Sequence, residues 1–245
     1  MNFFLVYLVC TVVLILFLFK TYRVNNDICI LLTTTVSVKK DMKFVAQSDK
    51  DERVQTYLKS IRQWLEKTDY KVVVVENSGH TFEELRKEKI QYKDRFEVIT
   101  FTEETLKGAE YLKEIKNKGD HEVFAVQYAY EHSKLLHDSD FIIKITGRYY
   151  VPGLQPYLQR TYLKQYHAIS QYDSGRCELI GCSNDAFQMM FDLNMEDEKG
   201  YNPHAESVYK YRLTKKIESK ELLVLPAFII EPTQRGGVPE VFTVL

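Results

Sequence analysis

The stretch Phe141–Tyr150, with the sequence FIIKITGRYY, combines the pattern of a buried strand with side chains that can bind an anion. Its first three residues are apolar, which predicts a strand in the core of a sheet. Lys144 and Arg148 then supply two cations, and Gly147 stands where the strand should end. A glycine lets a ligand or another backbone approach closely, and a guanidinium matches a phosphate or carboxylate. We interpret the stretch as the edge of an anion site, although a strand with an ordinary turn and a surface ion pair explains it equally well.

Strand alternation places Lys144, Thr146 and Arg148 on one face of this strand. In open α/β sheets, ligands bind just beyond the carboxyl ends of the strands. We therefore expect the three side chains to act together on a phosphate-bearing donor. A row of surface residues would have the same period.

Two earlier predicted strands also end in polar residues that could contact a nucleotide. The first strand covers residues 28–38, and the second covers residues 71–75. The polar residues at their ends are Thr33, Thr34, Thr35, Glu76 and Asn77. An acidic residue at the end of a second parallel strand often binds a ribose hydroxyl, so we assign that role to Glu76. Strand propensity and turn chemistry account for the same residues without any ligand.

Runs of strand and helix character alternate along the chain and predict an α/β fold. Strands are expected at residues 28–38, 71–75, 96–101, 167–171, 179–182 and 222–230, besides the stretch discussed above. Helices are expected at residues 53–67, 81–89, 121–136, 154–166, 186–191 and 201–213. This order is typical of a mostly parallel sheet flanked by helices.

Composition limits the class of protein. The chain has 245 residues, of which 45% are hydrophobic and 27% charged, a balance typical of a globular domain. The formal net charge of −1 provides no positive field for a polyanion, so we expect no nucleic acid partner. Cys177 and Cys182 are close enough in sequence to form a local disulfide in an oxidising compartment, but their spacing does not match a zinc pair.

Phe3–Phe19 is an uninterrupted run without a charge, at the short end of the roughly 17–25 residues that cross a bilayer as a helix. We interpret it as an uncleaved, single-pass signal-anchor, because no basic residue precedes it and no small-residue cleavage site follows, as a signal peptide would require. The chain then divides into an anchor (residues 1–20), a stem (21–27) and one domain (28–245). Lys20 and Arg23 favour a cytoplasmic domain, whereas an enzyme of the secretory pathway (ER or Golgi) needs the opposite topology, so the side of the membrane stays open.

The anchor, the alternating strands and helices, and the string KITGRY together resemble the GT-A type glycosyltransferases over about residues 27–237. The likeness is greatest to bacterial and viral sugar transferases with a K-[IL]-TGRY stretch. It implies a Rossmann-like α/β sheet and the transfer of a hexosyl or pentosyl group from a nucleotide-sugar donor to a glycan or lipid-linked acceptor. A catalytically inactive binding or assembly module of the same fold is the alternative, since fold does not establish function. A nucleotidyltransferase would need a glycine-rich loop after the first strand, and Thr33–Val38 contains no glycine.

In most members of this fold, the strand that corresponds to IKIT ends in an Asp-x-Asp motif that holds a divalent metal on the donor diphosphate. Thr146-Gly147-Arg148 stands at that place here. Cationic side chains can neutralise the departing diphosphate instead, so we expect that no cofactor is required, while a dependence on Mn²⁺ or Mg²⁺ stays open. Asp138 and Asp140 form a literal Asp-x-Asp, but they precede the strand and should lie at the opposite edge of the sheet.

Two carboxylates are candidates for the general base that takes the proton of the acceptor hydroxyl. Glu206 is the first candidate, because an acid from the carboxyl-terminal half has this role in similar enzymes, and Asp185 is the second. Each is predicted near a helix start close to the ligand edge, where a carboxylate also interacts favourably with the helix dipole. Arg235 is predicted to close over the diphosphate or to belong to a plain turn.

Overall fold

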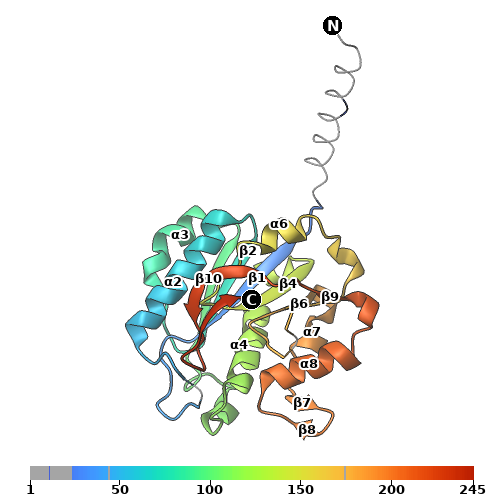
Figure 1. The fold of residues 1–245 in the computed structure, drawn as a ribbon. Helices are drawn as coiled ribbons and strands as arrows, with labels where there is room; N and C mark the ends of the chain where they lie inside the picture. Colours follow the sequence, from blue (N-terminus) through green and yellow to red (C-terminus); the bar gives the residue numbers. More distant parts are fainter. Residues whose placement is uncertain (1–10, 12–23, 44, 174) are drawn as a thin grey trace.

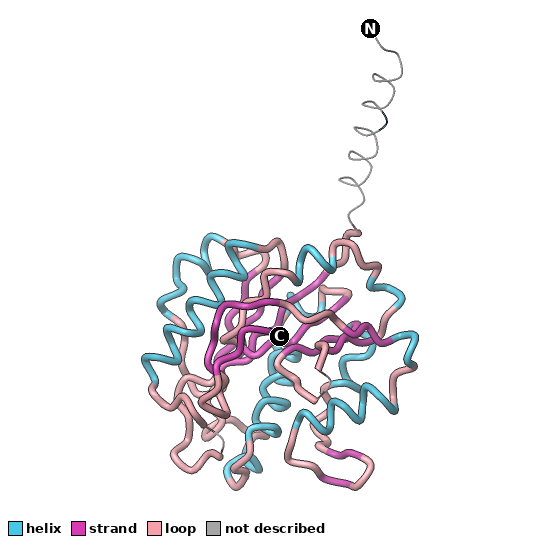
Figure 2. The backbone as a smooth tube through the Cα atoms, viewed as in Figure 1, coloured by secondary structure: helices cyan, strands magenta, loops and turns pink. Residues whose placement is uncertain are grey.

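The computed structural model describes Thr11 and residues 24–43, 45–173 and 175–245. Its main feature is a seven-stranded sheet with helices on both faces, shown as a ribbon in Figure 1 and as a backbone tube in Figure 2. The strands follow the order β3-β2-β1-β4-β6-β5-β9. They comprise β1 (Ile28–Thr34), β2 (Lys71–Glu76), β3 (Phe96–Thr100), β4 (Phe141–Thr146), β5 (Ala168–Ser170), β6 (Leu179–Ser183) and β9 (Leu222–Val224).

The first four strands are parallel, and the chain changes direction across the sheet after β3. It runs outward from β1 through β2 to β3 and then returns to place β4 on the other side of β1. The carboxyl ends of β1 and β4 therefore flank a topological switch point, where open α/β sheets bind ligands. Beyond β4 the sheet is mixed, because β6 is antiparallel to both β4 and β5.

Both faces of the central strands are buried, as the apolar head of the first strand predicted. Ile30 and Leu32 pack on one side beneath α2 (Lys50–Lys67) and α6 (Leu154–Leu158). Cys29 and Leu31 pack on the other side. The helices of that second face are α4 (Lys118–His132), α5 (Lys134–His137), α7 (Phe187–Met190) and α8 (Ala205–Lys215). Alternate residues of β1 thus enter two separate cores, as expected of a parallel strand covered on both faces.

Local signals position the two long helices that later frame the site. Asp49 caps α2 by accepting a hydrogen bond from the Glu52 amide at 2.8 Å. The Asn117 side chain caps α4 in the same manner, accepting from the Gly119 amide at 3.1 Å. The short α3 (Arg86–Gln91) follows a 3₁₀ turn at Glu83–Leu85, so the predicted helix at 81–89 begins later than expected.

The carboxyl-terminal segment differs from the prediction of one last strand at residues 222–230. It divides into β9 in the main sheet and β10 (Ile229–Gln234), which pairs with β11 (Val241–Val244) in a separate antiparallel ribbon. The strand β10 ends at Gln234, and the plain turn offered for Arg235 follows it directly. A second small ribbon consists of β7 (Glu196–Asp197) and β8 (Gly200–Tyr201).

No helix within the described part of the chain is long and apolar enough to span a bilayer. The predicted anchor at Phe3–Phe19 lies outside the described residues except for Thr11. Cys177 and Cys182 are both buried with free thiols, so the predicted local disulfide is absent from this structure.

Candidate functional site

A cavity of about 550 Å³ opens at the carboxyl edge of the sheet, at the switch point between β1 and β4. Its volume falls within the range of about 300–1,000 Å³ that is usual for ligand pockets. Seven of the predicted site residues line it: Thr33, Thr34, Thr35, Asn77, Thr146, Arg148 and Arg235. Glu206, the predicted base, lines it as well. The strand ends that the sequence singled out therefore meet at one site.

Gly147 lies where β4 leaves the sheet, and it allows the chain to pass close to β1. Its amide donates a hydrogen bond to the Thr33 carbonyl at 2.8 Å. A Cβ added at Gly147 would lie 2.5 Å from the Thr34 methyl group and 2.8 Å from the Thr33 carbonyl oxygen. The glycine is thus required by the neighbouring backbone, one of the two reasons that the sequence offered, and it does not line the cavity.

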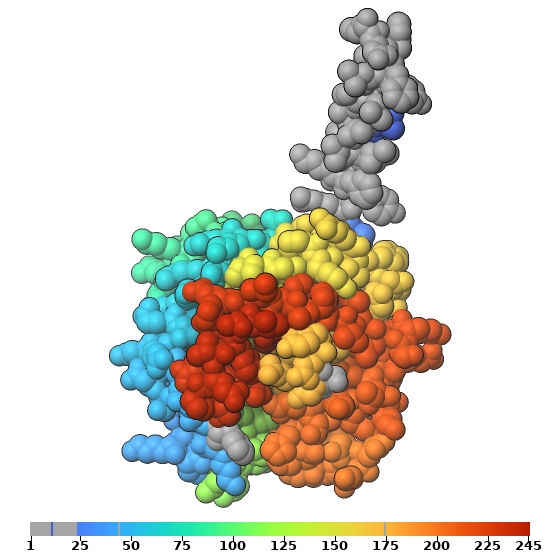
Figure 3. Space-filling model, in the orientation of Figure 1, coloured from blue at the N-terminus to red at the C-terminus, as the bar shows by residue number. Residues whose placement is uncertain are grey.

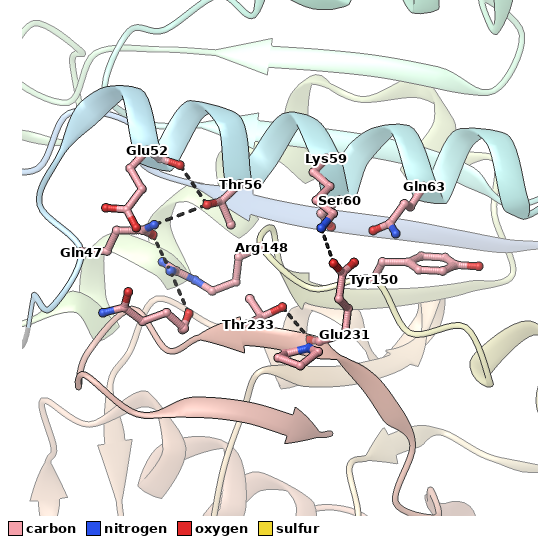
Figure 4. A pocket seen from close by; sticks show the side chains of 12 residues that line it. Gln47, Glu52, Thr56, Lys59, Ser60, Gln63, Arg148, Tyr150, Glu231 and Thr233 are labelled. Carbon is pink, nitrogen blue, oxygen red and sulfur yellow. Dashed lines mark hydrogen bonds and ion pairs between the residues drawn. The ribbon is translucent and has the colours of Figure 1, made fainter.

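Arg148 separates this cavity from a smaller one of about 200 Å³ between α2 and β10, which Figure 4 shows from close by. The residue is 6% exposed. Its Nη1 donates to Gln47 Oε1 at 2.9 Å and to the Gln234 carbonyl at 3.3 Å, while the buried Nε has no hydrogen-bond partner among the described residues. The hydrogen bonds that hold the guanidinium are therefore to neutral groups only, and its Nε has no acceptor among the described residues.

Arg53 is a second buried guanidinium in the wall of the cavity, and the sequence reasoning did not single it out. It donates to the Thr35 carbonyl at 2.6 Å, to the Gln47 carbonyl at 2.8 Å and to the Tyr57 hydroxyl at 2.8 Å. Arg53 and Arg148 both approach the Tyr57 ring, at 5.6 and 5.9 Å from its centroid. Burial lowers the pKa of Arg53, and the positive charge of Arg148 adds to that effect.

Within the described parts of the chain, no carboxylate forms an ion pair with Arg53 or Arg148. Burying a cation without a counter-charge costs free energy, and two such cations beside each other also repel. An anionic ligand in the cavity would offset both costs. This arrangement is the main electrostatic feature of the site.

Lys118 adds a third cation, at the start of α4. It lines the cavity, and its ammonium group lies 3.2 Å from the Gly236 carbonyl. Burial, and after it the positive charges of Arg53, Arg148 and Arg235, together lower the pKa of Lys118 to about 8, against the opposing effect of Glu122.

Lys144 does not line the cavity together with Arg148, contrary to the prediction from strand alternation. It is fully buried, forms an ion pair with Glu122 of α4, and donates to the Cys177 carbonyl at 2.8 Å. Burial alone would lower the pKa of Lys144, but the Glu122 carboxylate raises it above the usual value. β4 ends at Thr146, so the alternation that relates Lys144 to Thr146 no longer fixes the direction of Arg148.

Glu76 is also buried and turned away from the cavity, which corrects its assignment to a ribose hydroxyl. Its oxygens accept hydrogen bonds from the amides of Val36 (2.8 Å), Ser78 (3.0 Å) and His80 (2.7 Å). The carboxylate therefore fixes the loops that follow β1 and β2. It supports the cavity wall without touching a ligand there.

A buried chain of hydrogen bonds connects α4 with the end of β1, and no pattern in the sequence singled it out. His121 Nδ1 lies 2.6 Å from Glu103 Oε2, and its Nε2 lies 3.0 Å from the Ile115 carbonyl. Asn77 donates to the other Glu103 oxygen and accepts from the Thr35 hydroxyl at 2.7 Å. Burial opposes the charged form of His121, but the Glu103 carboxylate raises its pKa. Both ring nitrogens face oxygen atoms, an arrangement that favours the doubly protonated imidazole.

The turn between β10 and β11 covers the cavity. Arg235 Nε lies 3.0 Å from Glu178 Oε1, and its Nη2 lies 3.8 Å from Glu206 Oε1. A Cβ added at Gly236 would lie 2.5 Å from Arg148 Nη2, so a larger residue where the turn crosses the guanidinium would have to displace it. The space-filling view in Figure 3 shows this carboxyl-terminal segment in red against the loop that follows β5 in gold. Arg235 therefore closes over the cavity, where two carboxylates hold it.

The remaining predicted acids lie at the opposite edge of the sheet. β6 runs antiparallel to β4, so Ser183 at its end pairs with Phe141 at the start of β4. Asp185 follows Ser183, and the Asn184 amide donates to the Asp140 carbonyl at 3.0 Å. The prediction that Asp185 lies at the ligand edge is therefore wrong. The alternative pair Asp138 and Asp140 lies at this distant edge, as the sequence indicated.

The residues around the cavity do not fit a divalent metal. No group of three or more His, Cys, Asp or Glu side chains is arranged to hold a metal ion in the described part of the chain. At the end of β4, where the resemblance would place two carboxylates, the buried guanidinium of Arg148 is present.

Comparison with solved structures identifies the fold. The glycosyltransferase GlyE of Streptococcus pneumoniae TIGR4 matches 82% of this chain with a TM-score of 0.50 and 8% identity, and the match spans 45% of the GlyE chain. The galactosyltransferase LgtC, solved with donor and acceptor sugar analogs, matches 80% of this chain and 72% of its own, with a TM-score of 0.47 and 12% identity. A cytidylyltransferase from Leptospira borgpetersenii matches 89% and 82%, with a TM-score of 0.44 and 12% identity.

No protein-family model matches this sequence, and no curated protein sequence matches it either. The fold is a GT-A-like α/β arrangement, with a mixed, mostly parallel sheet of seven strands flanked by helices. At identities this low, similarity shows the fold alone, and function has to be argued from the site.

Proposed function

We propose that this protein is a glycosyltransferase that moves a sugar residue from a nucleotide-sugar donor to a glycan or lipid-linked acceptor. One observation carries the proposal: Arg53 and Arg148 are buried beside a cavity at the switch point of the sheet, and neither has a carboxylate partner among the described residues. A diphosphate is the anion that a GT-A-like fold with a sugar-sized cavity would bind there. The hydroxyl and amide groups of Thr33, Thr35 and Asn77 provide neutral contacts for the nucleoside at the adjacent strand ends.

The proposed chemistry relies on cationic side chains at the leaving group. When the bond between the sugar and the diphosphate breaks, negative charge develops on the departing oxygen. Arg148, Arg53 and Lys118 would stabilise that charge, and fixed donors in a cavity with little water are effective because they need no reorganisation. Since these groups neutralise the diphosphate, we propose transfer that does not require a divalent metal.

The acceptor hydroxyl must lose a proton to a carboxylate in the same cavity. Glu206 lines the cavity on α8, and its side chain is 38% exposed, so it stays a candidate for this role. Asp185 does not, because it lies at the far edge of the sheet.

The membrane assignment is a separate part of the proposal. The apolar run Phe3–Phe19 would tether the domain to a bilayer as a single-pass anchor. A tether is consistent with a lipid-linked or membrane-associated glycan acceptor. Which side of the membrane the domain faces stays open.

Titration calorimetry of the full chain tests the donor site. The probes are UDP, UDP-glucose, UDP-galactose, UDP-N-acetylglucosamine and GDP-mannose, each with and without EDTA. The variant Arg148→Met should weaken binding of the best probe by about 100-fold, since hydrogen bonds to a charged partner contribute about 1.5–3 kcal/mol each. Arg62→Met is the matched control, because Arg62 lies on the same helix as Arg53 but pairs with Glu88 at the surface.

Three outcomes distinguish a metal-independent glycosyltransferase from an inactive binding module and from a wrong assignment of the diphosphate. Binding that survives EDTA and is lost in Arg148→Met supports the proposal. Binding without any hydrolysis or transfer of the sugar supports the inactive binding module. Unchanged affinity in Arg148→Met, or complete loss in EDTA that Mn²⁺ restores, overturns the assignment of the diphosphate to these arginines.

A further inference from the structure

Four buried polar atoms without a hydrogen-bond partner among the described residues belong to residues that line the main cavity. Glu122 Oε1 is one of them, but it forms an ion pair with Lys144. The other three are Arg148 Nε, the Tyr149 hydroxyl and Glu178 Oε2. Buried polar groups are nearly always hydrogen-bonded, so each exception needs an explanation. Two donors and one acceptor at one end of a cavity suit a ligand that carries hydroxyl groups beside an anion.

Glu178 provides the acceptor atom among these three, and one backbone contact and one side-chain contact hold it in place. Its carbonyl oxygen accepts a hydrogen bond from the Thr146 amide at 2.8 Å, which attaches it to the end of β4. Its Oε1 lies 3.0 Å from Arg235 Nε. The residue is 6% exposed, so the carboxylate is shielded from solvent beside the arginine that closes the cavity.

The other glutamates that line the cavity are either engaged elsewhere or more exposed. Glu103 accepts from Asn77 and His121, and Glu122 pairs with Lys144. Glu104 is 52% exposed, and its carboxylate lies 3.9 Å from Lys39. Glu206 reaches Arg235 only at 3.8 Å. Glu178 alone among these five combines burial, a fixed backbone and an oxygen with no partner.

We infer that Glu178 is the carboxylate that accepts the acceptor's proton, and that Arg235 covers it until the donor arrives. In the ligand-free protein Arg235 pairs with Glu178. A donor diphosphate bound at Arg148 offers Arg235 a stronger partner, because it carries more charge and several acceptor oxygens. When Arg235 turns to the diphosphate, Glu178 loses its counter-charge and becomes available to a hydroxyl. The inference rests on the proposed function, since it needs a diphosphate donor.

The reaction step balances as a single displacement. The acceptor oxygen forms a bond to the anomeric carbon while the bond between that carbon and the diphosphate oxygen breaks. The electron pair of the breaking bond goes to the diphosphate, where Arg148 and Arg235 stabilise it. The proton of the acceptor hydroxyl goes to Glu178, and with water as acceptor the same step is donor hydrolysis.

The test compares Glu178→Gln with Arg235→Met in the full chain, using the nucleotide sugar from the five probes that the wild type binds best. Hydrolysis or transfer should fall at least about 100-fold in Glu178→Gln, within the range for a lost general base. Donor affinity in this variant should stay equal or rise, because Arg235 no longer has a competing partner. Arg235→Met should instead weaken donor binding about tenfold. A residue that only supported the fold would not move affinity and turnover in opposite directions.

Control variants distinguish the loss of a general base from a general effect of removing a carboxylate. Glu218→Gln alters an exposed glutamate outside the cavity and should leave turnover unchanged, and Glu178→Ala should regain activity with added formate. Glu206→Gln should lose less than about tenfold. If Glu178→Gln keeps more than a tenth of wild-type turnover, or if its donor affinity falls as far as that of Arg148→Met, the assignment is wrong. If the wild type itself binds and hydrolyses none of the probes, the proposed function fails first.

Discussion

Arg148 and Arg212 are two buried arginines in different regions of the molecule. They are 6% and 2% exposed, and neither forms an ion pair with a carboxylate in the described residues. Arg212 on α8 donates to the carbonyls of Met190 (2.8 Å), Asp192 (3.0 Å) and Asn194 (2.6 Å). Arg148 has two neutral acceptors, an Nε without a partner, and a cavity on each side.

The difference shows why burial of a cation does not by itself indicate a ligand. Arg212 donates to three carbonyls at the end of α7 and in the turn after it, so its charge serves to hold that turn. Among the described residues the Nε of Arg148 has no acceptor. Arg53, another buried guanidinium without a carboxylate partner there, lies beside the same tyrosine ring. The first arrangement is structural and closed, whereas the second is open to a partner.

The largest expected effect is on stability, and it separates the two arginines. Arg212→Met should lower the free energy of unfolding by about 4 kcal/mol, because three carbonyls lose a charged donor and become unsatisfied. Arg148→Met should change it by less than about 1 kcal/mol, since the lost hydrogen bonds are offset by removal of an unpaired buried charge. Urea unfolding of both variants, at unchanged slope, measures the two values.

Equal losses in the two variants would break the comparison. Arg148 would then be a structural arginine like Arg212, and the cavity beside it would need another explanation. Arg62→Met, at the surface of α2, provides the reference for a partly exposed ion pair, which contributes about 0–1 kcal/mol.

A smaller effect should appear in the pH dependence of donor binding. Lys118 has its pKa lowered to about 8 by burial and by the nearby arginines, so it loses its proton in the free protein above that pH. A bound diphosphate favours the charged ammonium and raises this pKa. Binding then takes up a proton above about pH 8, and affinity should fall by up to tenfold per pH unit there.

Calorimetry of UDP-glucose, or of whichever probe binds, at about pH 7, 8 and 9 measures this slope. Lys118→Met should remove most of the slope and bind more weakly at pH 7. A slope that persists in Lys118→Met assigns the titration to another group and removes Lys118 from the diphosphate site.

Much of this site could be predicted because the ends of buried strands have a recognisable sequence pattern. Apolar runs that stop at polar residues located Thr33, Asn77 and Arg148, and the parallel β1–β2–β4 core brought them together. The sequence does not show whether a strand runs parallel or antiparallel to its neighbours, and this limited the prediction of the site. Nothing in LIGCS reveals that β6 runs antiparallel, and this reversal moved Asp185 to the far edge.

The sequence also does not predict which side chains from distant segments form hydrogen bonds or ion pairs with each other. Glu76 lies at the end of β2, as expected, but its carboxylate oxygens accept hydrogen bonds from the amides of Val36 and His80 and not from a ligand. Lys144 finds Glu122 on α4, and Glu178 meets Arg235 from the last ribbon. Such pairs depend on packing between elements far apart in sequence, which propensity and periodicity do not encode.

The smallest expected effect concerns the far edge of the sheet, where Asp138, Asp140 and Asp185 gather. Lys71 donates to the Asp138 carbonyl at 2.8 Å, and Asn184 donates to the Ser139 carbonyl at 2.8 Å, so local contacts account for this turn. The triple variant with Asn at the three positions should keep donor affinity within about twofold, with or without Mn²⁺, because these side chains lie across the sheet from Arg148. If the variant instead abolished metal-stimulated binding, the Asp-x-Asp at the strand start would be a functional metal motif, and the contrast between an open carboxyl edge and a closed amino edge would no longer hold.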